Sequence, residues 1–303
     1  MTEIREIASG LEFPEGPIAI ADGSVLVVEI KRGTLTRVRA DGAKETVAET
    51  GGGPNGAAIG PDGKVYICNN GGFEWHDLGG MPMPGDQPAD YTGGSIQRVD
   101  LETGAVESVY TECDGIPLKG PNDIVFDSQG GFWFTDLGKS RPRESDRTGI
   151  FYALPDGSSI REMVFPLVTP NGIALSPDQS RVYVAETQTG RVFYWDLEGP
   201  GRIRPNPLSP NQGTLLAGLP GLQLLDSMAV DADGNVCVAT IINGGITVIS
   251  PDGSSVDHVP MPDLMTTNIC FGGSDLRTAY ITLSATGRLV STQWRTAGLK
   301  LAF

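Results

Sequence analysis

Histidine, cysteine and basic residues are scarce in this chain, and each shortage excludes a class of function. Its 303 residues include 2 histidines, 4 cysteines and 22 lysines plus arginines, against 37 aspartates plus glutamates. The formal charge of −15 provides no basic surface for nucleic acid and disfavours contact with an anionic membrane. No run approaches the roughly 18 apolar residues of a membrane span. The N-terminal MTEIREIASGLEFPEGP has no apolar core of signal-peptide length.

The four cysteines are widely spaced and include no C-x-x-C pair. Three of them stand in apolar, strand-like runs, so we expect buried free thiols. Free thiols and the absence of an export signal together favour a reducing, cytoplasmic location. The cysteines are Cys68, Cys113, Cys237 and Cys270.

A glycine-rich stretch at residues 51–63, GGGPNGAAIGPDG, contains the pattern G-x-G-x-x-G. A dinucleotide-binding loop with this pattern closes a strand and opens a helix, whose N-terminus holds the phosphates. Here a short apolar run, a Pro-Asp-Gly turn and an alternating run follow, which predicts a β-hairpin. The chain also contains neither a P-loop nor a G-x-S-x-G serine-hydrolase motif.

The hairpin is one of six similar segments that recur at intervals of 40 to 67 residues. Each has a short apolar run, a turn and a second, alternating apolar run. Seven positions after the first residue an Asp stands in five segments, and a Gly follows in four. The segments begin at Glu15, Asn55, Asn122, Asn171, Asp226 and Asn268.

Further β-like runs lie between these segments, for example GTLTRVRADG, GIFYALPDGS and GITVISPDG. They supply a third and a fourth strand for each repeat, and helical periodicity is nearly absent. Four strands repeated six times predict an all-β fold, a six-bladed β-propeller with antiparallel blades around a central channel. We expect residues 1–303 to form one such domain, closed by a strand at Glu3–Ile7 beside the C-terminal GRLVSTQW.

The first residue of every repeat carries a side-chain oxygen. In a propeller the innermost strand of each blade runs along the channel, so six equivalent positions surround one axis near its mouth. Simple capping of strand ends is the alternative reading. Two carboxylates and four amides, with neither His76 nor His258 among them, favour a hard divalent cation. We expect one ion in the channel, Ca²⁺ first, with Mg²⁺, Mn²⁺ or Zn²⁺ as alternatives.

Four motifs resemble the senescence-marker-protein/gluconolactonase/luciferin-regenerating-enzyme-like family, which includes regucalcin and bacterial lactonases. They are FPEGP at 13–17, GPNDIVFD at 120–127, TPNGIALSPD at 169–178 and DSMAVDADGN at 226–235, and the resemblance spans essentially the whole chain. It implies a six-bladed propeller with one divalent cation. The implied metal ligands are Glu15, Asn122, Asn171 and Asp226, and Asp226 is also the implied catalytic base.

The resemblance implies a metal-dependent hydrolase that opens a lactone, with a small-molecule lactone or ester as its partner. Sugar-lactone members often carry an arginine shortly before the blade-three asparagine, whereas the nearest basic residue here is Lys119. A less polar lactone therefore remains an alternative substrate. Two alternatives are an organophosphate or ester hydrolase of the diisopropyl-fluorophosphatase type and a non-catalytic binding propeller with a structural cation.

Loops that follow the second strand of each blade should surround the ligand mouth. The longest, Gly71–Gly94, is rich in apolar residues and lacks a strand pattern, so it reads as a functional cap or as packing on a neighbouring blade. A second loop brings Lys139, Arg141 and Arg143, which either meet a substrate carboxylate or are simply solvated. The residues that end the second strands have two possible interpretations: a second polar ring that orients ligands or substrate, or ordinary polar strand ends. As substrate contacts we expect Asn55, Trp75, Lys119, Asp136 and Asn268.

Overall fold

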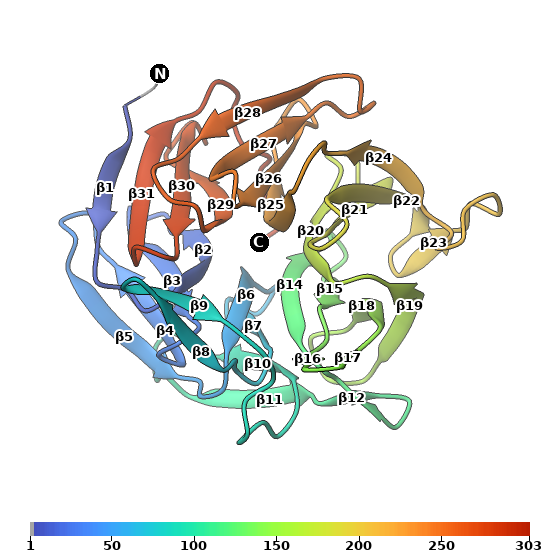
Figure 1. Ribbon diagram of the computed structural model, residues 1–303, viewed down its shortest axis with the longest axis horizontal. Helices are drawn as coiled ribbons and strands as arrows, with labels where there is room; N and C mark the ends of the chain where they lie inside the picture. The colour runs from blue at the N-terminus through green and yellow to red at the C-terminus, as the bar shows by residue number, and fades with distance from the viewer. Residues whose placement is uncertain (1–2) are drawn as a thin grey trace.

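Six antiparallel sheets stand in a ring around a central channel in the computed structural model, which describes residues 3–303 (Figure 1). Blades 1 to 3 follow each other along the chain, and the first strand of each lies innermost. Their strands are β2 (Pro14–Ala19), β3 (Val25–Glu29), β4 (Thr34–Val38) and β5 (Lys44–Glu49); β6 (Pro54–Ile59), β7 (Val65–Asn69), β10 (Ser95–Val99) and β11 (Val106–Tyr110); and β14 (Pro121–Phe126), β15 (Phe132–Asp136), β18 (Thr148–Ala153) and β19 (Ile160–Leu167).

Blades 4 to 6 complete the ring, and blade 4 carries one extra short strand at its outer edge. Their strands are β20 (Pro170–Leu175), β21 (Arg181–Glu186), β22 (Arg191–Gly199), β23 (Arg202–Arg204) and β24 (Thr214–Gly218); β25 (Leu224–Val230), β26 (Val236–Ile241), β27 (Gly245–Ile249) and β28 (Val256–Pro260); and β29 (Thr266–Gly272), β30 (Thr278–Leu283), β31 (Arg288–Gln293) and β1 (Arg5–Ala8). The six-bladed propeller predicted from the repeats is confirmed.

The N-terminal strand closes the ring. β1 pairs antiparallel with β31, and Arg5 lies opposite Ser291. The Thr292 hydroxyl also donates a 3.0 Å hydrogen bond to the Glu3 carbonyl. The predicted partner of the C-terminal blade is therefore in place, and blade 6 combines both ends of the described chain.

The Asp-Gly turns of the repeat are tight turns between the innermost and second strands. In blade 1 the Asp22 carboxylate accepts the Ser24 amide at 2.8 Å, and Gly23 has φ of 85°. Gly63, Gly130 and Gly234 occupy the same place with φ of 74°, 88° and 84°. A side chain would be strained at that φ, which explains why glycine recurs there.

The hydrophobic core lies between neighbouring blades. Blades 2 and 3 share a cluster that includes Tyr66, Phe126 and Phe132, and blades 3 and 4 share Trp133 and Trp195. Three cysteines are buried and Cys270 is half-buried, and none forms a disulfide, as expected. Residues 3–303 contain no helix, and therefore none long and apolar enough to cross a membrane.

Three two-stranded hairpins project from the ring. β8 (Trp75–Leu78) pairs with β9 (Met81–Pro84), β12 (Glu112–Cys113) with β13 (Ile116–Pro117), and β16 (Ser140–Arg141) with β17 (Glu144–Ser145). The expectation that residues 71–94 lack strands was wrong, because backbone pairing from Trp75 to Pro84 builds a hairpin there. Neither WHDL nor MPMP shows a clear alternating pattern.

The far end of the channel is apolar. A cavity of about 380 Å³ is lined by the inward faces of all six innermost strands and by the C-terminal residues 299–303. The Phe303 ring meets the Phe126 ring edge-on, with 6.0 Å between centroids. Figure 1 shows the end of the chain at the centre of the ring. The polar mouth of the channel lies at the opposite ends of these strands.

Candidate metal centre in the channel

The six oxygen-bearing repeat residues lie near the starts of the innermost strands. Each of their side chains is at least nine-tenths buried. Asn268 donates to Glu15 across the closure of the ring at 2.6 Å, and the Asn171 amide lies near the Asp226 carboxylate. The predicted ring is thus assembled by strands from all six blades: Glu15, Asn55, Asn122, Asn171, Asp226 and Asn268.

Glycines directly after three ring residues let neighbouring strands approach each other closely. A Cβ atom at Gly16 would lie 2.5 Å from the Asn55 carbonyl oxygen, and one at Gly56 would lie 2.5 Å from that of Asn122. At Gly172 the distance to the Asp226 carbonyl would be 2.6 Å. No side chain fits at these distances, so the pairs Glu-Gly and Asn-Gly hold adjacent ring residues together.

Four ring oxygens are buried without a hydrogen-bond partner: Glu15 Oε1, Asn55 Oδ1, Asn122 Oδ1 and Asn171 Oδ1. Other atoms of the same residues are fixed. Glu15 Oε2 accepts the Gly16 amide at 2.5 Å and the Asn268 amide at 2.6 Å, while Asn171 Nδ2 donates to Thr187 Oγ1 at 3.1 Å. Buried polar atoms are rarely left unpaired, because desolvation then costs roughly 1–3 kcal/mol each. These oxygens therefore suit a bound cation.

Burial also makes negative charge costly in the ring. Burial, followed by the nearby Asp226 carboxylate, raises the pKa of Glu15 well above its ordinary value. Burial raises the pKa of Asp226 to about 7; the neighbouring Asn171 amide opposes this rise and the charge of Asp123 adds to it. A cation among these groups would stabilise both ionised carboxylates.

The donor set determines which ion the ring can hold. Within residues 3–303, no three His, Cys, Asp or Glu side chains form a cluster able to bind a metal. A cation at the ring would thus depend on the amide oxygens as much as on the carboxylates. Oxygen-only coordination with neutral ligands suits Ca²⁺ or Mg²⁺ and does not suit zinc. The residues present therefore match the expected divalent ion.

Asp123 is a third buried carboxylate beside the ring, and sequence reasoning missed it. It follows Asn122, where blades 1, 2 and 4 have glycine. Its oxygens accept the Ile124 amide at 3.0 Å and the Ile173 amide of the next blade at 3.1 Å. Burial raises its pKa to about 7. The departure from glycine at this repeat position was the signal that could have revealed it.

Residues that end the second strands hold the backbone that leads into the ring. Glu29 accepts the Glu12 amide at 2.6 Å, Asn69 accepts the Gly53 amide at 2.9 Å, and Glu186 accepts the Val168 amide at 2.9 Å. Asp136 accepts the amides of Lys119, Gly120 and Gly138 at 2.7, 2.7 and 2.9 Å. In four blades this side chain therefore positions the loop two or three residues before a ring residue.

The expected substrate contacts occupy different places. Asn55 presents its free oxygen within the ring. The Asn268 side-chain amide donates to Glu15, and its side-chain oxygen accepts the Ile269 amide. Asp136 directs its carboxylate at backbone. Lys119 is tied through its main chain, because its carbonyl accepts the Tyr91 hydroxyl at 2.6 Å. Asn55 is therefore the one of these four with an unpaired oxygen in the ring.

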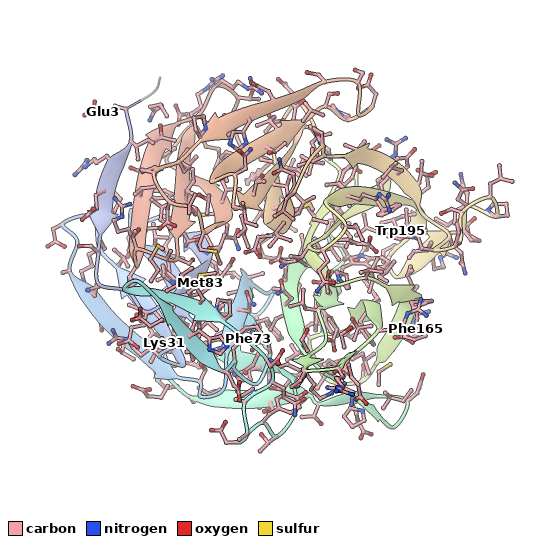
Figure 2. The ribbon with its side chains drawn as sticks, in the orientation of Figure 1. Glu3, Lys31, Phe73, Met83, Phe165 and Trp195 are labelled. Atoms are coloured by element: carbon pink, nitrogen blue, oxygen red, sulfur yellow. The ribbon has the colours of Figure 1, made fainter. Side chains whose placement is uncertain are left out.

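Trp75 belongs to a cap hairpin, residues 73–86, that lies over one side of the mouth. Its ring packs on Phe13, with 5.0 Å between centroids. Phe73, Trp75, Met81 and Met83 pack together against a cluster at the mouth ends of blades 1, 5 and 6: Phe13, Ile30, Ile241, Met265 and Ala285. Figure 2 shows Phe73 and Met83 over blades 1 and 2, inward of Lys31.

The expectation that the three cations of the 137–149 loop are solvated or free to meet a substrate is wrong for Lys139 and Arg141. Lys139 is 2% exposed, and its amine contacts the carbonyl of Gly72 at 2.5 Å. Arg141 forms a 2.8 Å ion pair with Asp146. Neither cation is free to meet a substrate carboxylate in this arrangement.

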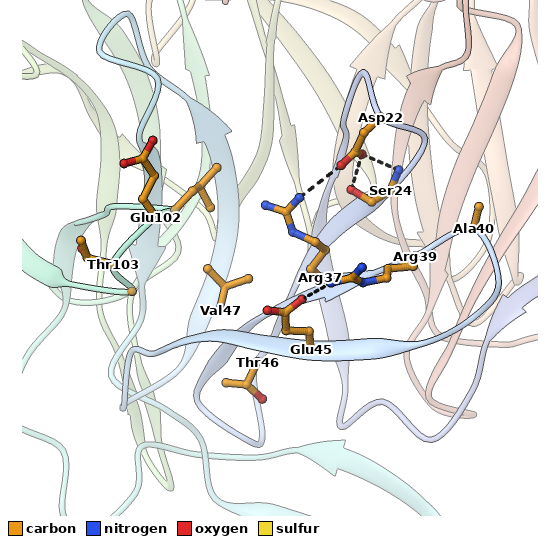
Figure 3. Close-up of a pocket in the computed structure, with 12 residues that line it drawn as sticks. Asp22, Ser24, Arg37, Arg39, Ala40, Glu45, Thr46, Val47, Glu102 and Thr103 are labelled. Carbon is orange, nitrogen blue, oxygen red and sulfur yellow. Dashed lines mark hydrogen bonds and ion pairs between the residues drawn. The ribbon is translucent and has the colours of Figure 1, made fainter.

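A second hollow of about 610 Å³ lies at the far face between blades 1 and 2 (Figure 3). Its two arginines are already paired: Arg37 with Asp22 at 3.3 Å and Arg39 with Glu45 at 2.7 Å. Exposed pairs of this kind contribute little energy and leave no unpaired buried group that would select a ligand. The channel mouth is therefore the stronger candidate site.

Known proteins share both the sequence pattern and the fold. The chain is 27% identical to a gluconolactonase of Zymomonas mobilis, covering 98% of this chain and 83% of the relative. It is 30% identical to lactonase drp35 of Staphylococcus saprophyticus, covering 84% and 71%.

Solved structures at lower identity share the propeller. A gluconolactonase from Xanthomonas campestris superposes with a TM-score of 0.75 at 21% identity, covering 96% of this chain and 89% of that one. The calcium-binding protein regucalcin from Agrobacterium tumefaciens gives 0.73 at 18%, covering 99% and 98%. Residues 13–285 match the SMP-30/gluconolactonase/LRE-like region, and the chain belongs to that family.

Proposed function

We propose that this protein is a lactone hydrolase that works with one divalent cation in the channel mouth. Glu15, Asn122, Asn171 and Asp226 would hold the ion, with Ca²⁺ as the first expectation. The observation that carries the proposal is the set of four buried ring oxygens without partners, contributed by blades 1 to 4. The relatives named as lactonases give the reaction class.

When bound, the cation supplies a Lewis acid for the lactone carbonyl and for the negative charge that develops on its oxygen. The protein's own groups orient the reactants. Asn55 offers a free buried oxygen on the same ring as a hydrogen-bond acceptor for substrate or water. Asp226 is the acceptor for the proton of the attacking water.

The side chains around the mouth favour a lactone with an apolar substituent. Trp75, Met81 and Met83 from the cap hairpin form an apolar group with Phe13, two residues before Glu15. Lys119 stands near the position where sugar-lactone relatives often carry arginine. An apolar face beside a polar ring suits a ring ester whose polar end meets the cation and whose substituent meets the hairpin.

A hydrolysis panel tests the proposal. Sugar, aliphatic and aromatic lactones and one phosphotriester are offered to chelator-treated protein, with and without added Ca²⁺, Mg²⁺, Mn²⁺ or Zn²⁺, and proton release is followed with an indicator. We expect cation-dependent opening of lactones, fastest for those with apolar substituents. Cation-dependent turnover of the phosphotriester alone would replace lactone opening with ester hydrolysis of the phosphotriesterase kind. A cation that raises the melting temperature without any turnover would contradict catalysis.

A further inference from the structure

Lys139 is a buried amine that no part of the proposed chemistry uses. It follows β15 in blade 3, yet its Nζ atom reaches residues that follow β7 in blade 2. It donates to the Gly72 carbonyl at 2.5 Å and to Asn70 Oδ1 at 3.3 Å. It also lies 4.1 Å from the ring centroid of Phe73 and 5.5 Å from that of Tyr91. One side chain thus contacts both flanks of the cap hairpin.

The location of these contacts gives them a specific consequence. Gly72 and Phe73 belong to the segment that enters the hairpin, and Tyr91 belongs to the segment that leaves it. The Glu74 amide donates to the Asp86 carbonyl at 2.9 Å, which closes the hairpin base next to Lys139. The Gln87 amide donates to the Ser140 carbonyl at 2.9 Å, and this second link also joins the hairpin base to the Lys139 loop.

The far part of the hairpin packs on apolar side chains of blades 1, 5 and 6, and the Lys31 amine lies 5.7 Å from the Trp75 ring centroid. Its strands are short, and two of the four residues in β9 are prolines, so β9 can donate few backbone hydrogen bonds. An isolated two-stranded hairpin has little stability of its own. The orientation of Trp75, Met81 and Met83 over the mouth therefore depends strongly on how the base is fixed.

We propose that Lys139 is a positioning residue that fixes the cap hairpin over the channel mouth and thereby sets the affinity for lactones with an apolar substituent. This inference rests on the proposed function. The amine donates hydrogen bonds whether charged or neutral, so the anchor persists in both forms. Burial lowers its pKa to about 7, although Asp136 and Asp146 oppose that shift, which agrees with an amine enclosed by the loop.

The test compares Lys139→Met with Lys64→Met. Methionine keeps an unbranched apolar chain but removes every donor, which leaves the Gly72 carbonyl without this partner. Lys64 is a half-buried residue on the far-face turn of blade 2, paired with Asp100 at 3.3 Å, and controls for loss of a lysine. For Lys139→Met we expect KM for an apolar-substituted lactone to rise about tenfold and kcat to change less than about twofold. KM for an unsubstituted lactone stays the same.

Amide hydrogen exchange supplies a readout that needs no substrate. In Lys139→Met we expect exchange in residues 73–86 to accelerate about tenfold, while exchange in β14 and β20 stays as in the parent. Faster exchange without any lactone turnover in the parent protein would refute the proposed function and keep the anchor. Unchanged exchange and unchanged KM would overturn the inference.

A second variant covers failure of the first to fold. Phe73→Leu removes the aromatic face beneath the amine and leaves Lys139 in place. We expect KM to rise as in Lys139→Met, but by a smaller factor. In the double variant, the fold-increase in KM should be smaller than the product of the two single-variant fold-increases. Fully multiplicative effects would show that the two side chains act independently and would contradict the anchor.

Discussion

Asn268 donates a 2.6 Å hydrogen bond to Glu15 across 253 positions of sequence, where the last blade meets the first. This bond fixes one carboxylate oxygen and leaves the other, Glu15 Oε1, buried without a partner. The same contact therefore closes the propeller and orients a proposed metal ligand. The ring can present its oxygens only when all six blades have assembled.

Loss of one amide oxygen should weaken the cation site. We expect Asn122→Ala to raise the dissociation constant for Ca²⁺ at least about tenfold, because one of the unpaired oxygens disappears. Asn243→Ala, at an exposed position after β26, should leave it unchanged. Isothermal titration of chelator-treated protein measures both. Equal affinity of the Asn122 variant and the parent would remove Asn122 from the ligand set.

Replacement of the proposed base should separate binding from chemistry. Asp226→Asn keeps the size of the side chain and removes its capacity to accept a proton. We expect kcat for lactone opening to fall by about 10³ while the propeller stays folded. Asp233→Asn, on an exposed turn of the same blade, is the matched control and should keep parental kcat. An active Asp226→Asn protein would assign the proton transfer elsewhere.

Asp123 should support the ring from within the channel. Its carboxylate accepts amides from blades 3 and 4, and an asparagine would turn two donors toward one of them. We expect Asp123→Asn to lower the free energy of unfolding by about 1–3 kcal/mol in urea titrations with chelator present. Higher stability would instead show that repulsion from Glu15 and Asp226 dominates in the parent protein.

The buried amine of Lys139 should make stability depend on pH. Burial lowers its pKa to about 7, whereas the ordinary value is 10.5. Between these values the unfolded chain binds one more proton, so stability rises with pH and falls as pH drops toward 7. From pH 7 to 9 we expect the parent to gain roughly 1 kcal/mol per pH unit relative to Lys139→Met. Parallel unfolding curves for both proteins at each pH would contradict the shifted amine.

The repeat made the ring predictable, because equivalent residues of a propeller must share one height along the channel. Glu15, Asn122 and Asp226 were therefore grouped from the repeat, and each lies near the start of an innermost strand, although more than 100 residues separate the first from each of the others. The same register explains the turn glycines such as Gly23. Alignment of the repeats also reveals the exception at Asp123. In its own blade it looks like part of an ordinary Asn-Asp pair, but the equivalent position in blades 1, 2 and 4 is glycine.

Other features depend on contacts that no local pattern encodes. Asp136 looks like a pocket carboxylate at a strand end, but three backbone amides of nearby loops occupy its oxygens. Lys139 looks like a solvated loop cation, but Phe73 and Gly72 from another blade enclose it. In both cases tertiary packing between loops decides the role, and the loop sequences have no periodicity that reports it.

One titration tests the central claim most directly. Chelator-treated protein receives Ca²⁺ in steps, and heat of binding and rate of lactone opening are followed on the same sample. We predict one bound ion per chain, with binding and turnover saturating together, and both curves shifted to at least about tenfold higher Ca²⁺ concentration in Asn122→Ala. Full turnover with chelator present and no bound cation would contradict a lactone hydrolase that works through the channel ion.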